Sequence, residues 1–238
     1  MLACYLAWDA MNHLARVPVK QRQVELKLAA MKVQVDLFGS QLGPFVEIFG
    51  EQDYGLVPSF RGKPGDTIID AGAHVGFYAL WQARAMETGQ IFAFEPNPDV
   101  YKHLKYNLSA NGFGWIKTYP YALSARQESL ILIASGREST VAATVHDGDG
   151  IAVKAWTLDQ LVETEGIKKI DVLKMDTEGA EAEIVKGGLT RAIPITERIV
   201  MESHNTRYDV LHLLEPFGFR LVHDGRDPNI VYFERQHG

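Results

Sequence analysis

The sequence predicts an α/β protein in which helices cover both faces of a mostly parallel sheet. Short apolar runs alternate with amphipathic stretches along most of the chain, which is the pattern of repeated strand–helix units. With 238 residues the chain is long enough to bury one full core of this kind. Its 46% hydrophobic and 23% charged residues are typical of globular domains and exclude disordered and collagen-like classes.

The strand–helix units begin near residue 67 and follow one another regularly. The first unit has a strand at 67–70, a turn with glycines, and a helix from 78 to about 86. The later elements expected are strands 91–94, 116–121, 170–175 and 198–201, helices 98–110, 180–189 and 208–214, and a closing hairpin of 219–223 with 230–233. Ligands of such sheets bind outside the carboxyl ends of the strands.

Two regions depart from this rhythm. Apolar residues recur at helical spacing near the N-terminus, and a second stretch runs from Gln21 towards Lys32, so we expect a helical extension over residues 1–44. The domain proper then covers 45–238. Between 128 and 156 the pattern changes to alternating β segments with Ser-Gly and Asp-Gly turns, which predicts a β-hairpin insertion beside the main sheet.

Charge and cysteine content narrow the choice of partners and compartment. The formal net charge is 24 minus 30, or −6, and the basic residues form no block, so we expect no nucleic-acid partner. The apolar opening Met1 to Trp8 is too short to span a bilayer, and we expect no membrane association. The single Cys4 cannot form an internal disulfide, which fits the cytoplasmic location that we expect.

The sharpest motif lies between the first expected strand and its helix. It reads Asp70-Ala71-Gly72-Ala73-His74-Val75-Gly76-Phe77. The first glycine permits a tight turn and close approach of a ligand, and the second lets the helix pack on the strand. Dinucleotide folds use Gly-x-Gly-x-x-Gly here, so this spacing favours S-adenosylmethionine over NAD. A tight turn without any ligand explains the glycines equally well.

Two further strand ends carry candidate cofactor residues. Glu95 ends the second strand about twenty residues after the turn and is followed by Pro96 and Asn97, a position from which a carboxylate accepts both ribose hydroxyls. The third strand ends at Tyr121-Ala122-Leu123, where backbone groups and an apolar side chain can bracket an adenine. A plain strand end fits that segment as well.

Candidate catalytic residues follow the fourth and fifth strands. Lys174 and Asp176 alternate onto one face, so an ion pair can orient the carboxylate for accepting a hydroxyl proton. His204, two residues after Glu202, is a candidate general base, although structural hydrogen bonds explain both residues equally well. For Glu181 we favour a role in complementing the dipole of the helix that it begins.

Taken together, these motifs resemble the FkbM family of class I S-adenosylmethionine-dependent methyltransferases. The similarity runs from about Phe45 to Met201. The residues that carry it are Gly65-Asp66-Thr67-Ile68-Ile69-Asp70-Ala71-Gly72-Ala73-His74-Val75-Gly76, Phe94-Glu95-Pro96-Asn97-Pro98, Asn107, Asn111-Gly112, and Leu173-Lys174-Met175-Asp176-Thr177-Glu178-Gly179-Ala180-Glu181. The family usually has Asn at the position of His74, so a polar contact there would have altered geometry.

The resemblance implies a sheet order of 3-2-1-4-5-7-6 with the seventh strand antiparallel. It also implies that S-adenosylmethionine is the cofactor and S-adenosylhomocysteine the product. The methionine part would lie against the turn from Asp70 to Phe77, the ribose at Glu95 to Asn97, and the adenine at Tyr121 to Leu123. Tyr54 belongs to the lead-in to the site, and Asp176 would lie near the transferred methyl.

The function expected from these residues and the resemblance is O-methylation of a hydroxyl on a sugar, a polyketide or another small natural product. Asp176 or His204 would remove the proton, with Lys174 orienting the carboxylate. Alternatives are N-methylation of an amine or peptide, a non-catalytic S-adenosylmethionine-binding module and, less favoured, nucleic-acid base methylation or nicotinamide chemistry. A divalent metal is possible, with Asp176, Glu178 and Glu202 as oxygen ligands of suitable hardness, but no spacing in the sequence demands one. The N-terminal helices offer a surface for a homo-oligomer.

Overall fold

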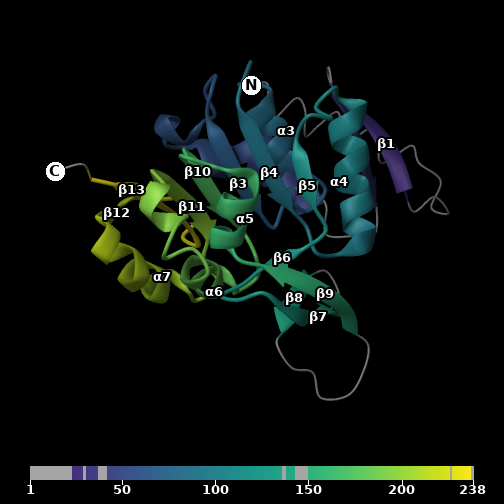
Figure 1. The fold of residues 1–238 in the computed structure, drawn as a ribbon. Coiled ribbons are helices and arrows are strands. Elements are labelled where there is room, and N and C mark those ends of the chain that lie inside the picture. The colour runs from purple at the N-terminus through teal and green to yellow at the C-terminus, as the bar shows by residue number, and fades with distance from the viewer. Residues whose placement is uncertain are drawn as a thin grey trace.

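We describe the protein from a computed structural model, in residues 23–28, 31–36, 42–135, 138–142, 150–225 and 227–236. Its centre is a seven-stranded sheet (Figure 1). The strands of this sheet are β3 (Thr67–Ala71), β4 (Gln90–Phe94), β5 (Lys117–Tyr119), β10 (Val172–Met175), β11 (Arg198–Glu202), β12 (Phe219–Asp224) and β13 (Ile230–Arg235).

The strand order confirms the predicted α/β class and places the chain in the class I arrangement. Across the sheet the order is β5-β4-β3-β10-β11-β13-β12, which reads 3-2-1-4-5-7-6 when these seven strands are counted along the chain. β13 runs antiparallel to β11 and β12, while β5, β4, β3, β10 and β11 pair in parallel. The sheet therefore gathers the carboxyl ends of β3, β4, β10 and β11 at one edge.

Helices cover both faces of the sheet and build two cores. Alternate strand residues face opposite sides, so that Ile68 packs under α3 (Phe77–Ala83) and α4 (Pro98–Ala110) whereas Ile69 packs on the other face. That second core is covered by α5 (Leu158–Glu165), α6 (Glu181–Lys186) and α7 (Arg207–Leu214). Among the described residues, no helix has the length and apolarity needed to cross a membrane.

Short helical segments link the N-terminal part to the sheet. α2 (Leu42–Phe45) continues into a π-helical stretch, Val46–Glu51. Single 3-10 turns follow at Asp53–Gly55 and Pro58–Phe60, and later at Ile193–Ile195 and Glu215–Phe217. The first of these turns buries Tyr54 completely, which carries its phenol group to the edge of the sheet described below.

The helix expected from Gln21 towards Lys32 is wrong. The chain forms an antiparallel hairpin of β1 (Gln23–Leu28) and β2 (Met31–Asp36) instead. Apolar and polar residues alternate with a period of two in β2, so that Met31 and Val33 are buried while Lys32 is exposed. The first expected helix, and with it the oligomer contact proposed for the N-terminal helices, falls on residues outside the described ones.

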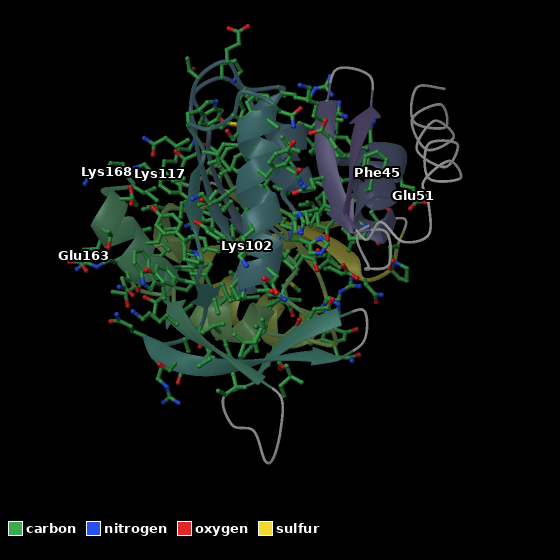
Figure 2. All side chains as sticks on the ribbon, turned by 90° about the vertical axis from the view of Figure 1, so that its right-hand side faces the viewer. Phe45, Glu51, Lys102, Lys117, Glu163 and Lys168 are labelled. Carbon is green, nitrogen blue, oxygen red and sulfur yellow. The ribbon has the colours of Figure 1, made fainter. Side chains whose placement is uncertain are left out.

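The hairpin is attached to α4, and Figure 2 shows the two side by side. Two asparagines, Asn107 of α4 and Asn111 at its C-cap, make the hydrogen bonds to β2 that a neighbouring strand would otherwise make. The Asn107 amide accepts from the Gln34 backbone nitrogen at 2.6 Å and donates to the Gln34 carbonyl at 3.2 Å. Asn111 pairs with the backbone of Lys32 in the same way, at 3.0 and 2.7 Å.

The insertion expected at 128–156 contains the predicted hairpin, which joins further strands in a second sheet of its own. It contains β6 (Ala122–Leu123), β7 (Glu128–Ser135), β8 (Glu138–Ala142) and β9 (Gly150–Trp156) in the order β6-β9-β7-β8. In Figure 1 this second sheet lies below the main sheet. Leu130, Leu132 and Val153 give it a small apolar core. The segment Ala122–Leu123, expected at the end of the third strand, belongs to this second sheet.

Candidate active site

The turn after β3 meets the end of β10 at very short range. Gly72 has φ 75°, and a Cβ added to it would lie 1.8 Å from the backbone oxygen of Asp176. The backbone nitrogens of Gly72 and Ala73 donate to the Phe94 carbonyl at 3.1 and 2.8 Å, which fixes the turn to the end of β4. Gly76 has φ 91° and would clash with Leu104 of α4 if it carried a side chain. Both glycines are therefore required by geometry.

Other residues of the turn serve the fold through their side chains. Ala71, Ala73 and Phe77 are buried in the two cores, so any ligand contact that they make is through the backbone. His74 adopts φ 51°, a left-handed conformation that is uncommon outside glycine. Burial lowers the pKa of His74 to about 4, so its ring is neutral at pH 7.

Glu95 lies at the end of β4, where the sequence predicts the ribose site. It is 8% exposed, and its carboxylate accepts from the backbone nitrogens of His74 at 3.0 Å and Asn97 at 2.7 Å. Asn97 also caps α4, because its side chain accepts from the Asp99 nitrogen at 3.0 Å. Pro96 lies between Glu95 and Asn97. Burial raises the pKa of Glu95 to about 7. Each carboxylate oxygen keeps a lone pair for a ligand hydroxyl.

Lys174 and Asp70 form a buried ion pair on neighbouring strands. Their charged atoms are 3.2 Å apart, with side-chain exposures of 3% and 0%. The Lys174 ammonium donates to the Gly72 carbonyl at 2.7 Å and lies 5.6 Å from the centre of the Tyr54 ring. Burial opposes the charge, but Asp70 and Asp176 raise the pKa of Lys174, so it stays a cation. Lys174 thus holds the turn rather than facing an acceptor.

Asp176 faces the open side of this arrangement. Its carboxylate is 25% exposed and lies 3.6 Å from the Lys174 ammonium, as the alternation in the sequence predicts. The Tyr54 hydroxyl donates to Asp176 at 3.1 Å and approaches Glu202 at 3.5 Å. Burial and these two carboxylates raise the pKa of Tyr54, so it remains a donor. The structure thus brings Tyr54, Lys174 and Asp176 together.

His204 lies among carboxylates. Its Nε2 atom is 3.1 Å from Glu178 and 3.7 Å from Glu202, and its Nδ1 atom is 3.6 Å from Glu181. The close contact with Glu178 and the neighbouring carboxylate of Glu181 raise the pKa of His204 to about 11. Burial and the nearby Asp176 raise the pKa of Glu202 to about 8. A protonated imidazole cannot act as the resting general base, so this part of the sequence-based prediction loses support.

Glu181 is the first residue of α6, as the helix-dipole interpretation requires, but its contacts extend further. It is completely buried and accepts from the hydroxyls of Thr177 and Thr206, which belong to two loops. The sequence signal for this further role is its place in the run Asp176-Thr177-Glu178-Gly179-Ala180-Glu181, directly after a buried strand.

The segment predicted to bracket the adenine borders a group of aromatic rings. Tyr121 stacks on Trp156 at 5.0 Å between ring centres, and Tyr119 stacks on Phe94 at 4.7 Å. The side chains of Ala122 and Leu123 are buried in the cores and cannot contact a ligand directly. Of this segment, only Tyr121 keeps a partly exposed side chain.

Three side chains have the spacing of a divalent metal site. Asp176, Glu202 and His204 each offer a ligand atom, and these atoms lie within 4.8 Å of one another. The Nε2 atom of His204 pairs with Glu178 at 3.1 Å, so a metal at this position would have to displace that contact. We therefore interpret the three as part of an ion-paired network. That a divalent metal is possible but not required stays a prediction.

Comparisons with known proteins agree with this geometry. A family model described as "Methyltransferase FkbM domain" matches residues 70–221. The hexuronic acid methyltransferase AglP of Haloferax volcanii is 29% identical over 159 residues, which span 66% of this chain and 64% of that protein. The 31-O-demethyl-FK506 methyltransferase FkbM of Streptomyces tacrolimicus is 25% identical, with 76% of this chain and 82% of that protein covered. The 2-O-methyltransferase NoeI of Sinorhizobium fredii is 26% identical over 155 residues, 56% of this chain and 61% of that protein.

A solved structure shares the fold. Trm5b of Pyrococcus abyssi superposes with a TM-score of 0.50 at 13% identity, over 91% of this chain and 56% of that one. The family match contains the turn after β3, Glu95, and the strand ends at Asp176 and Glu202, which are the residues that the structure gathers at one edge of its sheet. The chain therefore belongs to the FkbM family of S-adenosylmethionine-dependent methyltransferases.

Proposed function

We propose that the protein transfers the methyl group of S-adenosylmethionine to a hydroxyl of a sugar, a polyketide or another small natural product. The observation that carries this proposal is the contact between the cofactor turn and the Asp176 segment. The backbone nitrogen of Asp176 donates to the Ala71 carbonyl at 3.1 Å, and Gly72 lies against the Asp176 backbone oxygen. A carboxylate thus stands beside the expected methionine site. The names of the FkbM and NoeI relatives, both O-methyltransferases, support an oxygen acceptor.

The chemistry asks little of the protein beyond alignment and proton removal. Bound S-adenosylmethionine supplies both the methyl and its own leaving group, because the methyl–sulfur bond electrons return to sulfur. Asp176 would accept the hydroxyl proton as the oxygen forms its bond to the methyl carbon. The Tyr54 hydroxyl and the Lys174 ammonium hold this carboxylate from behind, at 3.1 and 3.6 Å.

The residues also fit the cofactor. A buried Glu95 with a raised pKa and free lone pairs suits two ribose hydroxyls, which replace lost water around the carboxylate. Gly72 leaves no room for a side chain at the turn, as a closely approaching methionine segment requires. The partly exposed Tyr121 ring, two residues after β5, is the aromatic candidate for the adenine.

A second candidate acceptor is an amine, because carboxylates predominate on this side of the sheet. Burial and the nearby Asp176 and Asp227 raise the pKa of Glu47, which adds a further acidic group to Glu178 and Glu202. The cations described here, Lys174 and His204, are both paired with carboxylates. Such a surface attracts a protonated amine and repels an anionic acceptor.

The first experiment is calorimetric titration of the full chain with S-adenosylhomocysteine, alongside NAD and repeated with Glu95→Ala. We expect binding of S-adenosylhomocysteine that Glu95→Ala weakens at least tenfold. Binding of NAD in preference would overturn the proposal. Hydroxyl- and amine-bearing acceptors are then screened with a labelled methyl group, and the product is analysed to distinguish oxygen from nitrogen methylation.

With an acceptor in hand, Asp176→Asn tests the base. We expect kcat to fall by about 10² to 10⁴ while S-adenosylhomocysteine affinity stays within twofold, because an amide cannot take the proton. Asp209→Asn, on the exposed face of α7, is the matched control. Full activity of Asp176→Asn would exclude it as the base. Cofactor binding with no turnover on the whole panel would favour a non-catalytic binding module.

A further inference from the structure

The buried carboxylate of Glu181 connects two loops at the open edge of the sheet. We propose that Glu181 is a positioning residue, which joins the loops after β10 and β11 and fixes His204 on the acceptor side of the site. This inference rests on the proposed function, because it concerns the side of the site where the acceptor would bind. Glu181 contacts each of the two loops separately.

The loop after β10 is bonded to one oxygen of Glu181. The Oε1 atom accepts from the Thr177 nitrogen at 3.2 Å, the Thr177 hydroxyl at 2.9 Å and the Gly179 nitrogen at 3.1 Å. Glu178, between these donors, has φ 55°, and Gly179 has φ 101°. A left-handed glutamate is strained and persists only when its surroundings hold it. The hydrogen bonds to Glu181 stabilise this conformation, which brings the Glu178 carboxylate to the Nε2 atom of His204.

The loop after β11 donates a hydrogen bond to one oxygen of Glu181 and places a histidine near the other. The Thr206 hydroxyl donates to Oε2 at 2.6 Å, from 25 residues further along the chain. The Nδ1 atom of His204 lies 3.6 Å from Oε1 of Glu181. Asn205, between His204 and Thr206 in the sequence, has φ 65°. His204 is therefore held from behind by Glu181, with its Nε2 atom turned to Glu178 and Glu202.

This arrangement sets the charge of His204. Burial alone would raise the pKa of Glu181, but the neighbouring His204 and hydrogen bonds from Thr206, Gly179 and Thr177 lower it to about 2, so it is ionised near neutral pH. The charged groups that face His204 are Glu178 and Glu181 from the β10–α6 segment, and Glu202 and Asp176 from the ends of β11 and β10. All are acidic. The imidazole thus serves as a fixed cation that organises the carboxylates, and Asp176 is left to receive the proton.

The test is a spectroscopic one that needs no acceptor. We would label the full chain with ring-¹⁵N histidine, assign His204 by comparison with His204→Gln, and titrate wild type, Glu181→Gln and Glu183→Gln. Glutamine keeps the size of Glu181 and an oxygen for Thr177 and Gly179, so a purely structural role survives the change. Glu183, on the same helix and about half exposed, is the matched control.

We expect both ring nitrogens of wild-type His204 to be protonated at pH 8. In Glu181→Gln the pKa of His204 should fall by about two pH units because the buried negative charge is lost, with no change in Glu183→Gln. A wild-type His204 that is neutral at pH 8, or an unchanged titration in Glu181→Gln, would overturn the proposal.

A second variant keeps the test decisive if Glu181→Gln fails to fold. Glu178→Gln removes the exposed partner of Nε2 and leaves Glu181 in place. We expect His204 to remain protonated at pH 8 in this variant, and an ordinary titration near pH 6.5 would show that Glu181 does not hold the charge. Calorimetry with S-adenosylhomocysteine runs in parallel. If wild type does not bind it, the proposed function fails while the titration still decides the role of Glu181.

Discussion

The ammonium of Lys174 lies 3.2 Å from the carboxylate of Asp70, directly across from it in the register of two adjacent parallel strands. Both side chains are removed from solvent, and the rings of Tyr54 and Tyr78 lie within 6 Å of the ammonium. Burial raises the pKa of Asp70, so its charge depends on this partner. The pair therefore couples the start of the cofactor turn to the strand that carries Asp176.

Lys174→Met should destabilise the protein strongly. The change leaves the Asp70 carboxylate buried without its cation, which costs about 3–5 kcal/mol of unfolding free energy. Chemical denaturation followed by circular dichroism measures this, with Lys186→Met, at an exposed position of α6, as the control. Adding Asp70→Asn to Lys174→Met should restore part of the loss. A double variant less stable than Lys174→Met alone would contradict the pairing.

Gly72→Ala should abolish cofactor binding or folding, because the new methyl would lie 1.8 Å from the Asp176 backbone oxygen. Gly112 is a matched control, since it too has a positive φ, of 81°, but no atom within 4 Å of an added Cβ. Gly112→Ala should cost only about 1 kcal/mol of backbone strain. Calorimetry with S-adenosylhomocysteine and thermal denaturation compare the two. Equal effects would show that φ, not the close approach, dominates at Gly72.

Binding of S-adenosylhomocysteine should strengthen as pH rises towards 7. Glu95 has its pKa raised by burial from 4.5 to about 7, and only its ionised form accepts both ribose hydroxyls. Affinity should therefore fall by up to about tenfold per pH unit below pH 7. In Glu95→Gln the affinity should be weaker and independent of pH in this range. Calorimetry between pH 5 and 8 provides the profile, and a flat wild-type profile would contradict the assignment.

The same carboxylate has the opposite effect on the ligand-free protein. A group whose folded pKa lies above its ordinary value stabilises the fold below that ordinary value, and the contribution is lost as pH rises through the folded pKa. For Glu95 this window runs from 4.5 to about 7. In denaturation experiments, Glu95→Gln should remove this decline. An identical pH dependence in both proteins would count against a buried, protonated Glu95.

Turnover on an identified acceptor should be unaffected by EDTA. The Nε2 atom of His204 is paired with Glu178, so the spacing of Asp176, Glu202 and His204 does not leave three free ligands. Initial rates with EDTA and with added Mg²⁺ should agree within twofold. Loss of activity in EDTA that Mg²⁺ or Mn²⁺ restores would reverse this interpretation and identify those three side chains as ligands.

The sequence predicts those parts of the site for which a local pattern is compatible with a single backbone structure. Gly72 between a buried strand and a helix, and Glu95 at the next strand end, follow from the strand–helix rhythm alone. The hairpin of β1 and β2 was missed because short amphipathic segments fit both periods. The hairpin is stabilised by packing against α4, where the side chains of Asn107 and Asn111 bond to the backbone of β2 as a neighbouring strand would.

The roles of Glu181 and His204 depend on residues that the sequence keeps apart. The carboxylate of Glu181 is bonded to Thr206, and its burial depends on how two loops fold over it. The charge of His204 is set by Glu178, Glu181 and Glu202, which come from two different strand–helix connections. No spacing rule predicts such a sum of contacts, so the sequence leaves His204 open between a general base and a structural role.

The asparagine pairs between α4 and β2 determine where this protein can be shortened. Asn107 is completely buried, and its amide also donates to the Val75 carbonyl in the cofactor turn at 2.9 Å. A recombinant fragment that begins at Phe45, close to the start of the family resemblance, would leave this amide half unsatisfied and uncover the apolar surface beneath Met31 and Val33. The smallest fragment that retains an intact cofactor turn therefore begins before Met31, well upstream of the residues by which the family is recognised.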